Sequence, residues 1–377
     1  MNATQAYSEL SARSKELAHL GSAIGLLHWD QRTNIPPKGH ASRVDQLAAL
    51  VAIHHQRTTD PRTGELLSVV EGSDPVSDPL SVEAVNIRHW RRDYDRVIRI
   101  PERLAVEITR ATAEGQSVWE KARPVNDWAH FRPFLERIVK LKREEAEAVG
   151  YEKEPYDALL DNYEEGETAG RLKPIFKRLV EALKSLLESI EGSPRRPVSR
   201  LSRVRFPVAD QEAFALHVIT RLGYELEAGR LDVSAHPFTS GIGPGDVRIT
   251  TRYSEDHPAE GLLAAIHEAG HAMYYQGLPL EHWGEPFCRP ASLGINESQS
   301  RMWENIVARS EAFWQHFYAD ATERFSGLAD VPLEDFVFSI NEVRPSLIRT
   351  EADEVTYNGS SLIGSAFGEG NCLRLLG

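Results

Sequence analysis

Residues 265–275, "AIHEAGHAMYY", contain two histidines four residues apart, with a glutamate directly after the first. Pro258 before this stretch and Gly277 after it are typical of the start and the end of a helix. Residues four apart on a helix share a face, so we expect His267 and His271 to project side by side. Glu268 then lies one position further round the same helix.

The H-E-x-x-H spacing is the arrangement in which two imidazoles hold zinc and the glutamate acts on a water molecule. The pattern alone also arises by chance, as a polar patch on an ordinary helix. Its neighbours favour a metal, because Ala269 and Gly270 permit another element to approach closely. Apolar Leu262 and Ile266 would bury the helix, and buried histidines need partners or an ion.

A catalytic zinc needs a third protein ligand and an open position. Residues 291–310, "ASLGINESQSRMWENIVARS", predict a new helix, and its Glu297 follows His267 by 297 − 267 = 30 residues. We therefore expect a His-His-Glu site for Zn²⁺, with Co²⁺ as a possible substitute, in which Glu268 accepts a proton and passes it to a leaving amine. The alternative is that Glu297 only complements the dipole at a helix N-terminus.

The rest of the chain predicts a mainly α fold with a small β hairpin or sheet beside the metal helix. Residues 246–254 alternate as a half-exposed strand, with Arg248, Thr250 and Arg252 on the exposed face, and the Gly-rich turn 240–246 precedes it. The connection 196–208 separates a helical lobe, 1–195, from a metal-site lobe, 209–357. Apolar positions recur at helical spacing in residues 5–29, 40–70, 79–96, 100–122, 128–149, 167–192 and 211–223.

Composition excludes several function classes. The 377 residues carry a formal net charge of −13, which disfavours nucleic-acid binding, and the basic clusters 88–96 and 193–205 are interpreted as a solvated helix face and a loop. We find no apolar run of about 20 residues that could span a membrane. The two cysteines and a polar N-terminus without a secretory signal predict a cytoplasmic protein.

Several short motifs resemble those of the M32 carboxypeptidases, typified by the thermostable carboxypeptidase Taq. The resemblance covers most of the chain, including the opening segment 26–39, "LLHWDQRTNIPPKG". The motifs are "HPF" (236–238), "DVRIT" (246–250), "HEAGH" (267–271), "NESQSR" (296–301) and "IRTEAD" (348–353).

The resemblance implies a clefted, zincin-like helical fold, a homodimer, and a zinc-dependent carboxypeptidase that removes C-terminal amino acids from peptides. It implies that His267, His271 and Glu297 are metal ligands and that Glu268 is the general base. Arg349 becomes the candidate contact for the substrate's terminal carboxylate, because a guanidinium binds a carboxylate bidentately. The remaining candidates for substrate binding or for support of the site are His236, Asp246, Arg248, Thr250, Asn296 and Asp353.

Each substrate candidate also has an ordinary structural reading. His236 could be a loop residue, Arg349 could pair with acidic neighbours on its own helix, and Arg248 could be an exposed charge on an edge strand. Asn296 stands where the family has histidine, so a contact that needs a titrating group is weakened there.

The chain leaves the family pattern at about Asn358. We interpret residues 1–377 as one M32-like peptidase domain that is incomplete at its C-terminus, with a divergent tail at 358–377. An active metallocarboxypeptidase is the leading hypothesis. The alternatives are a truncated, catalytically impaired relative that binds metal or peptide and, ranked last, an unrelated zincin endopeptidase. The preferred C-terminal residue, the physiological metal and the pathway are not predicted.

Overall fold

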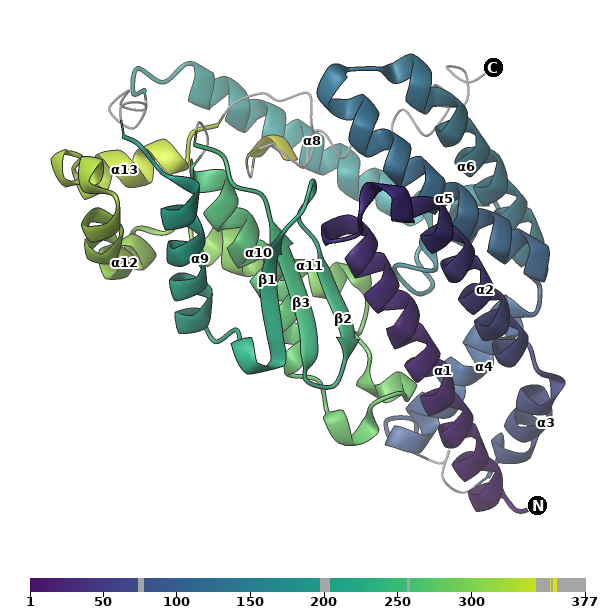
Figure 1. Cartoon of the computed structure of the whole chain (residues 1–377). Coiled ribbons are helices and arrows are strands. Elements are labelled where there is room, and N and C mark those ends of the chain that lie inside the picture. The colour runs from purple at the N-terminus through teal and green to yellow at the C-terminus, as the bar shows by residue number, and fades with distance from the viewer. Residues whose placement is uncertain (74–77, 197–203, 256–257, 344–352, 354, 358–377) are drawn as a thin grey trace. The chain divides into compact units, whose positions relative to one another are not determined.

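The computed structural model describes residues 1–73, 78–196, 204–255, 258–343, 353 and 355–357. The fold is mainly helical with one three-stranded sheet, which confirms the predicted class (Figure 1). Two compact units are present. The first comprises residues 1–165, 225–250 and 271–296, and the second comprises residues 166–224, 251–270 and 297–377.

The first unit begins with seven helices: α1 (Ala3–Thr33), α2 (His40–Thr58), α3 (Pro61–Val70), α4 (Val82–Val97), α5 (Glu102–Ala122), α6 (Trp128–Val149) and α7 (Pro155–Leu160). Helix α6 covers the range 128–149 where helical spacing was expected; Asp127 caps it through the backbone N–H of His130, and Gly150 follows its end with a φ of +87°. The stretch 40–70, with its apolar positions at helical spacing, forms two helices, α2 and α3. Asp60 and Pro61 start a new helix there, because the Asp60 side chain accepts from the N–H of Arg62 and proline suits a first helical turn.

The sheet also belongs to the first unit, and its strands are β1 (Gly229–Val233), β2 (Thr239–Gly243) and β3 (Asp246–Thr251), in the order β1-β3-β2. Antiparallel pairing of β2 and β3 puts Thr239 opposite Ile249, which confirms the hairpin. Helix α1 packs along β2 (Figure 1). Because β3 is the central strand, Arg248 is not an edge charge.

The prediction that Thr250 lies on an exposed face is wrong, since its relative exposure is 0%. Its hydroxyl lies 2.7 Å from the Ser234 hydroxyl and accepts from the backbone N–H of Phe238 at 3.0 Å. A second layer of chain therefore covers this side of β3, and alternation along one strand cannot reveal such a cover.

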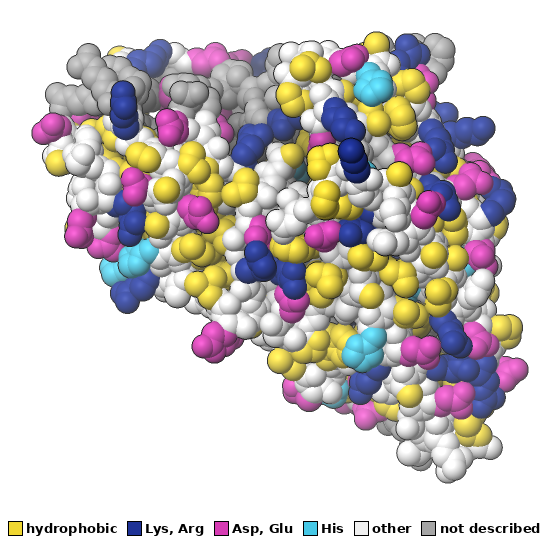
Figure 2. All heavy atoms as spheres, viewed as in Figure 1, with side chains coloured by type: hydrophobic (Ala, Val, Ile, Leu, Met, Phe, Trp, Pro, Cys, Tyr) yellow, Lys and Arg dark blue, Asp and Glu magenta, His cyan; other side chains and the backbone are white. Residues whose placement is uncertain are grey.

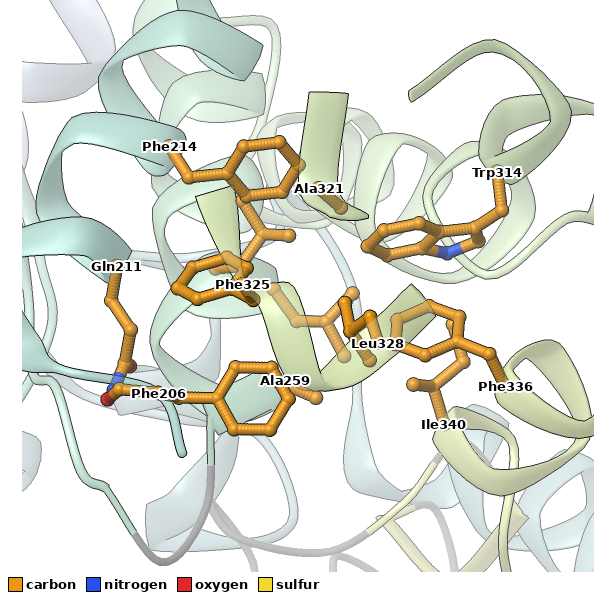
Figure 3. Close-up of a pocket in the computed structure, with 12 residues that line it drawn as sticks. Phe206, Gln211, Phe214, Ala259, Trp314, Ala321, Phe325, Leu328, Phe336 and Ile340 are labelled. Atoms are coloured by element: carbon orange, nitrogen blue, oxygen red, sulfur yellow. The ribbon is translucent and has the colours of Figure 1, made fainter. Parts of the chain in front are cut away.

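The second unit contains α8 (Ala169–Glu191), α9 (Val208–Leu222), α12 (Glu311–Arg324) and α13 (Leu333–Ile340). Its core is aromatic: Phe325 contacts Phe206 and Phe214, and Trp314 packs edge-on to Phe336 with ring centroids 4.4 Å apart. Figure 3 shows these rings around a cavity of about 60 Å³. Packed rings of this kind make a rigid support for the helices that carry them.

Charges on the surface are mixed rather than sorted by sign. On the face shown in Figure 2, Lys and Arg alternate with Asp and Glu. Within the cluster 88–96, Arg91 pairs with Glu71, and both Arg92 and Arg96 pair with Asp161. These arginines are engaged within the fold, in keeping with the interpretation of the cluster as an ordinary helix face. Among the helices that the structure describes, none has the length and apolar character needed to cross a membrane.

Some sequence predictions concern residues outside the described part of the chain. They are part of the basic cluster 193–205, the terminal-carboxylate candidate Arg349 and the divergent tail 358–377. The division into lobes 1–195 and 209–357 stays a prediction.

Candidate metal centre

Helix α10 (Pro258–Gln276) carries the H-E-x-x-H motif and ends just before Gly277, as predicted. Its apolar face is buried, with Ile266, Ala269 and Ala272 at 0% relative exposure. Glu268 is 6% exposed, whereas the His267 side chain keeps 19% of its surface accessible. The apolar face thus fixes the helix, and the imidazole of His267 stays within reach of a ligand.

Helix α11 (Leu293–Arg301) approaches α10 closely at Gly270. A Cβ on Gly270 would lie 2.7 Å from Ser300 Cα and 3.0 Å from the carbonyl oxygen of Gln299. Real side chains do not approach backbone atoms so closely, so this helix pair requires glycine at position 270. The close approach brings Glu297, one turn before Arg301, to the motif helix.

The three predicted ligands lie together. His267 Nε2 is 3.6 Å from Glu297 Oε2, and His271 follows His267 by one turn of the continuous helix α10. One potential ligand atom from each of His267, His271 and Glu297 lies within 4.8 Å of the others. Two nitrogens and one carboxylate oxygen are donors that suit zinc, and three protein ligands leave a position open.

Both imidazoles are engaged through their Nδ1 atoms. His267 Nδ1 lies 2.8 Å from Glu304 Oε2, and His271 Nδ1 lies 3.0 Å from Asn296 Oδ1. Both partners are acceptor oxygens, so each Nδ1 carries the proton and each Nε2 keeps a lone pair. Metal-binding histidines are usually held in this way, and the residues present therefore fit a metal ion.

Glu304 was not identified from the sequence. It lies in the π-helical turns Met302–Val307, which continue α11, and it also contacts Arg301 at 3.2 Å and Arg309 at 3.7 Å. Burial raises the pKa of its carboxyl, but the hydrogen bond from His267 and the positive charges of Arg301 and Arg309 outweigh burial, so the pKa is lowered. The spacing of Glu297, Arg301 and Glu304, four and then three residues, is the signal that could have placed them on one face.

Asn296, the residue before Glu297, is 5% exposed and lies behind His271. Its amide nitrogen donates to the hydroxyl of Tyr275 at 3.4 Å. The next residue, Glu297, is contacted by Ser300. Ser300 Oγ lies 3.1 Å from Glu297 Oε2 and 2.7 Å from the Glu297 carbonyl oxygen. Asn296 and Ser300 thus hold groups of the candidate site from behind.

The strand motif forms a local network of its own. Arg248 donates to both carboxylate oxygens of Asp246, at 2.7 and 2.8 Å, and its guanidinium lies 4.4 Å from the centre of the Trp29 ring. Thr250 holds the loop that contains His236, through the contacts with Ser234 and Phe238. His236 itself is exposed. These residues lie on β3 and on the loop between β1 and β2.

Asp353 makes local contacts near the end of the described chain. Its carboxylate accepts from the backbone N–H groups of Val355 and Thr356 and from the Thr356 hydroxyl. Four residues after Asp353, the Tyr357 ring lies 3.8 Å from the guanidinium of Arg301. Asp353 therefore acts as a cap for the turn that presents Tyr357 to Arg301.

Comparison with known proteins gives a consistent relationship over almost the whole chain. The family model "Carboxypeptidase Taq (M32) metallopeptidase" matches residues 9–362. Thermostable carboxypeptidase 1 of Thermus thermophilus is 53% identical over 368 residues, which are 95% of this chain and 72% of that protein. The crystal structure of BsuCP has a TM-score of 0.90 at 34% identity, covering 94% of this chain and 71% of that one.

A crystal structure of an M32 carboxypeptidase from Deinococcus radiodurans R1 has a TM-score of 0.84 at 36% identity. It covers 95% of this chain and 71% of that one. The family match, the sequence identity and the shared fold agree with one another. The chain belongs to the carboxypeptidase Taq (M32) metallopeptidase family and is a metallocarboxypeptidase.

Proposed function

We propose that this enzyme uses zinc, held by His267, His271 and Glu297, to remove single amino acids from the C-termini of peptides. One observation carries the proposal: three suitable ligand atoms lie within 4.8 Å of one another, and Nδ1 of each imidazole is already hydrogen-bonded. Orientation of this kind is typical of metal ligands and rare for histidines that meet on a surface by chance.

Zinc, when bound, supplies a Lewis acid that polarises the scissile carbonyl and makes a water molecule more acidic. Glu268 is proposed as the general base, whose carboxylate takes the proton of the attacking water and delivers it to the nitrogen of the leaving amino acid. Its 6% exposure restricts competition from bulk water for that proton. Glu297 supplies a negative charge beside the two neutral imidazoles.

An exopeptidase of this type must also recognise the terminal carboxylate. Arg248 is already paired with Asp246, so its charge is compensated within the fold. We therefore assign carboxylate recognition to Arg349, on its motif, and assign Asp246, Arg248 and Thr250 to holding the loop that carries His236. A cytoplasmic location and a homodimer belong to the same proposal.

Product analysis tests the proposed reaction. An N-blocked peptide is incubated with the purified protein and zinc or cobalt, and the products are identified by mass. Stepwise loss of single C-terminal residues is expected. The matched peptide with a C-terminal amide should react at least about 100-fold more slowly, because the protein group that binds the terminal carboxylate is then left unpaired. Internal fragments would instead indicate an endopeptidase, and no products with a stoichiometric metal would indicate an impaired relative.

Glu268→Gln separates chemistry from metal binding. The amide cannot accept the proton, so kcat should fall by about 100-fold to 10,000-fold while one zinc per chain is retained. Rate measurements and zinc analysis on the same preparation check this expectation. A variant with near-normal kcat would remove Glu268 from the role of general base.

A further inference from the structure

A partly buried ionic cluster lies behind His267, formed by residues outside the H-E-x-x-H motif. Glu304 is its centre, with a side chain that is 15% exposed. One oxygen, Oε2, lies 2.8 Å from His267 Nδ1 and 3.2 Å from Arg301, and the other, Oε1, lies 3.7 Å from Arg309. Two arginines and one imidazole therefore converge on a single carboxylate.

We propose that Glu304 is a positioning residue, which holds the His267 ring in the tautomer and orientation that the metal needs. The inference deepens the proposed function and rests on its metal site. Glu304 does not touch the substrate and is not itself a ligand. It acts through His267, and its effect is a higher affinity of the site for zinc.

The hydrogen bond decides the tautomer of His267. A carboxylate only accepts, so Nδ1 must carry the proton and Nε2 must carry the lone pair. That Nε2 is the atom that lies 3.6 Å from Glu297 Oε2. Without Glu304, the ring could rotate or adopt the other tautomer, and the lone pair would leave the site for part of the time. A carboxylate behind the ring also makes Nε2 a more basic ligand.

The rest of the cluster keeps Glu304 in place. Arg309 donates to the carbonyl oxygen of Ile340 at 2.6 Å, and Asn341 donates to the carbonyl oxygen of Arg309 at 2.9 Å. Arg301 is covered by the Tyr357 ring. These contacts hold the two arginines, and a movement of the Glu304 carboxylate away from His267 would weaken its ion pairs with Arg301 and Arg309.

The backbone around Glu304 is unusual in a way that agrees with a role at the site. Met302–Val307 is π-helical, and the N–H of Ala308 donates to the carbonyl oxygen of Trp303, five residues earlier, at 2.8 Å. π-Helical turns are rare and occur frequently at functional sites. A cluster that served only to stabilise the fold would not need this local departure from the α-helix.

Zinc affinity tests the proposal without depending on turnover. Affinities are measured by competition with a chelator for the full chain and for two variants, and thermal unfolding of the metal-free proteins is measured in parallel. Glu304→Gln removes the charge. Glu304→Asp keeps the charge near the arginines but withdraws the carboxylate from His267 by one methylene. Glu311→Gln, at an exposed glutamate in the first turn of α12, is the matched control.

Both Glu304 variants are expected to bind zinc about 10-fold to 100-fold more weakly, with the control unchanged. Metal-free Glu304→Asp should unfold within a few degrees of the parent, so that weaker zinc binding cannot be ascribed to a damaged fold. Parent-like zinc affinity in Glu304→Asp would overturn the proposal. If the parent binds zinc but cleaves no peptide, the proposed reaction fails while the inference stands; if the parent binds no zinc, both fail.

Discussion

The two histidines of the motif lie one helical turn apart, yet their surroundings differ in kind. His267 is backed by a partly buried carboxylate that two arginines contact, whereas His271 is backed by the neutral amide of Asn296, which in turn contacts Tyr275. Both arrangements protonate Nδ1 and free Nε2. Orientation and charge are therefore separate contributions. An amide can orient an imidazole ring, but only a carboxylate also makes the free ring nitrogen more basic and so a stronger metal ligand.

The largest expected effect comes from a change that disturbs the surroundings of both histidines at once. Gly270→Ala places a methyl group against the backbone of Ser300, so α11, which carries Asn296 and Glu297, must move away from α10. We expect zinc affinity to fall by about 100-fold, the upper range for loss of groups that support metal ligands. Chelator competition measures it.

Gly170→Ala is the matched control for this change, because Gly170 is also helical and has open space where the methyl group would be. Alanine there should stabilise the protein by about 1 kcal/mol or less and leave zinc binding unchanged. Equal zinc affinities in the two variants would show that the close helix approach does not build the site.

Asn296→Ala removes only the neutral amide behind His271. Loss of this one hydrogen bond should weaken zinc binding by about 10-fold. Glu304→Gln, which removes the carboxylate behind His267, should weaken it by at least as much. Titration with zinc under identical conditions ranks the two variants. A larger loss for Asn296→Ala would reverse the proposed asymmetry between the two histidines.

Ser300→Ala leaves both imidazoles untouched and alters only the hold on Glu297. The lost contact to Oε2 corresponds to about 1 kcal/mol, or roughly a fivefold weaker affinity for zinc. The same competition assay detects it. No change would mean that Glu297 is held by the close helix approach alone.

Asn296→Asp places a carboxylate behind His271, as Glu304 does behind His267, and has the smallest expected effect. A carboxylate behind His271 should raise zinc affinity about threefold, while burial of a new charge at a position with 5% exposure should lower the thermal stability of the metal-free protein. Affinity and melting temperature are read together. Weaker zinc binding in this variant would contradict the view that charge behind the ring strengthens the ligand.

Much of this site could be predicted from the sequence because its signals are local. The spacing of His267 and His271, the stop at Gly277 and the following helix with Glu297 each depend on a few consecutive residues. The requirement for a small residue at 270 also follows from the sequence, and the contact with Ser300 supplies its reason.

The features that the sequence did not reveal depend on tertiary contacts. Thr250 was expected on an exposed face, but the residues around Ser234 and Phe238 cover it. The spacing of Glu304 from Glu297 and Arg301 could have placed it on their helix face, but its contact with His267 joins residues 37 apart and could not be assigned from the sequence. Arg248 was a possible edge charge because the sequence of a single strand does not reveal the position of that strand in the sheet.

X-ray absorption at the zinc edge of the zinc-loaded protein tests the central claim most directly, that side chains from α10 and α11 hold one metal ion. We predict two imidazole nitrogens at about 2.0–2.1 Å and one carboxylate oxygen at about 2.0–2.2 Å, with the second imidazole lost in His271→Gln. A sulfur neighbour at about 2.3 Å, or a spectrum that His271→Gln leaves unchanged, would contradict the account.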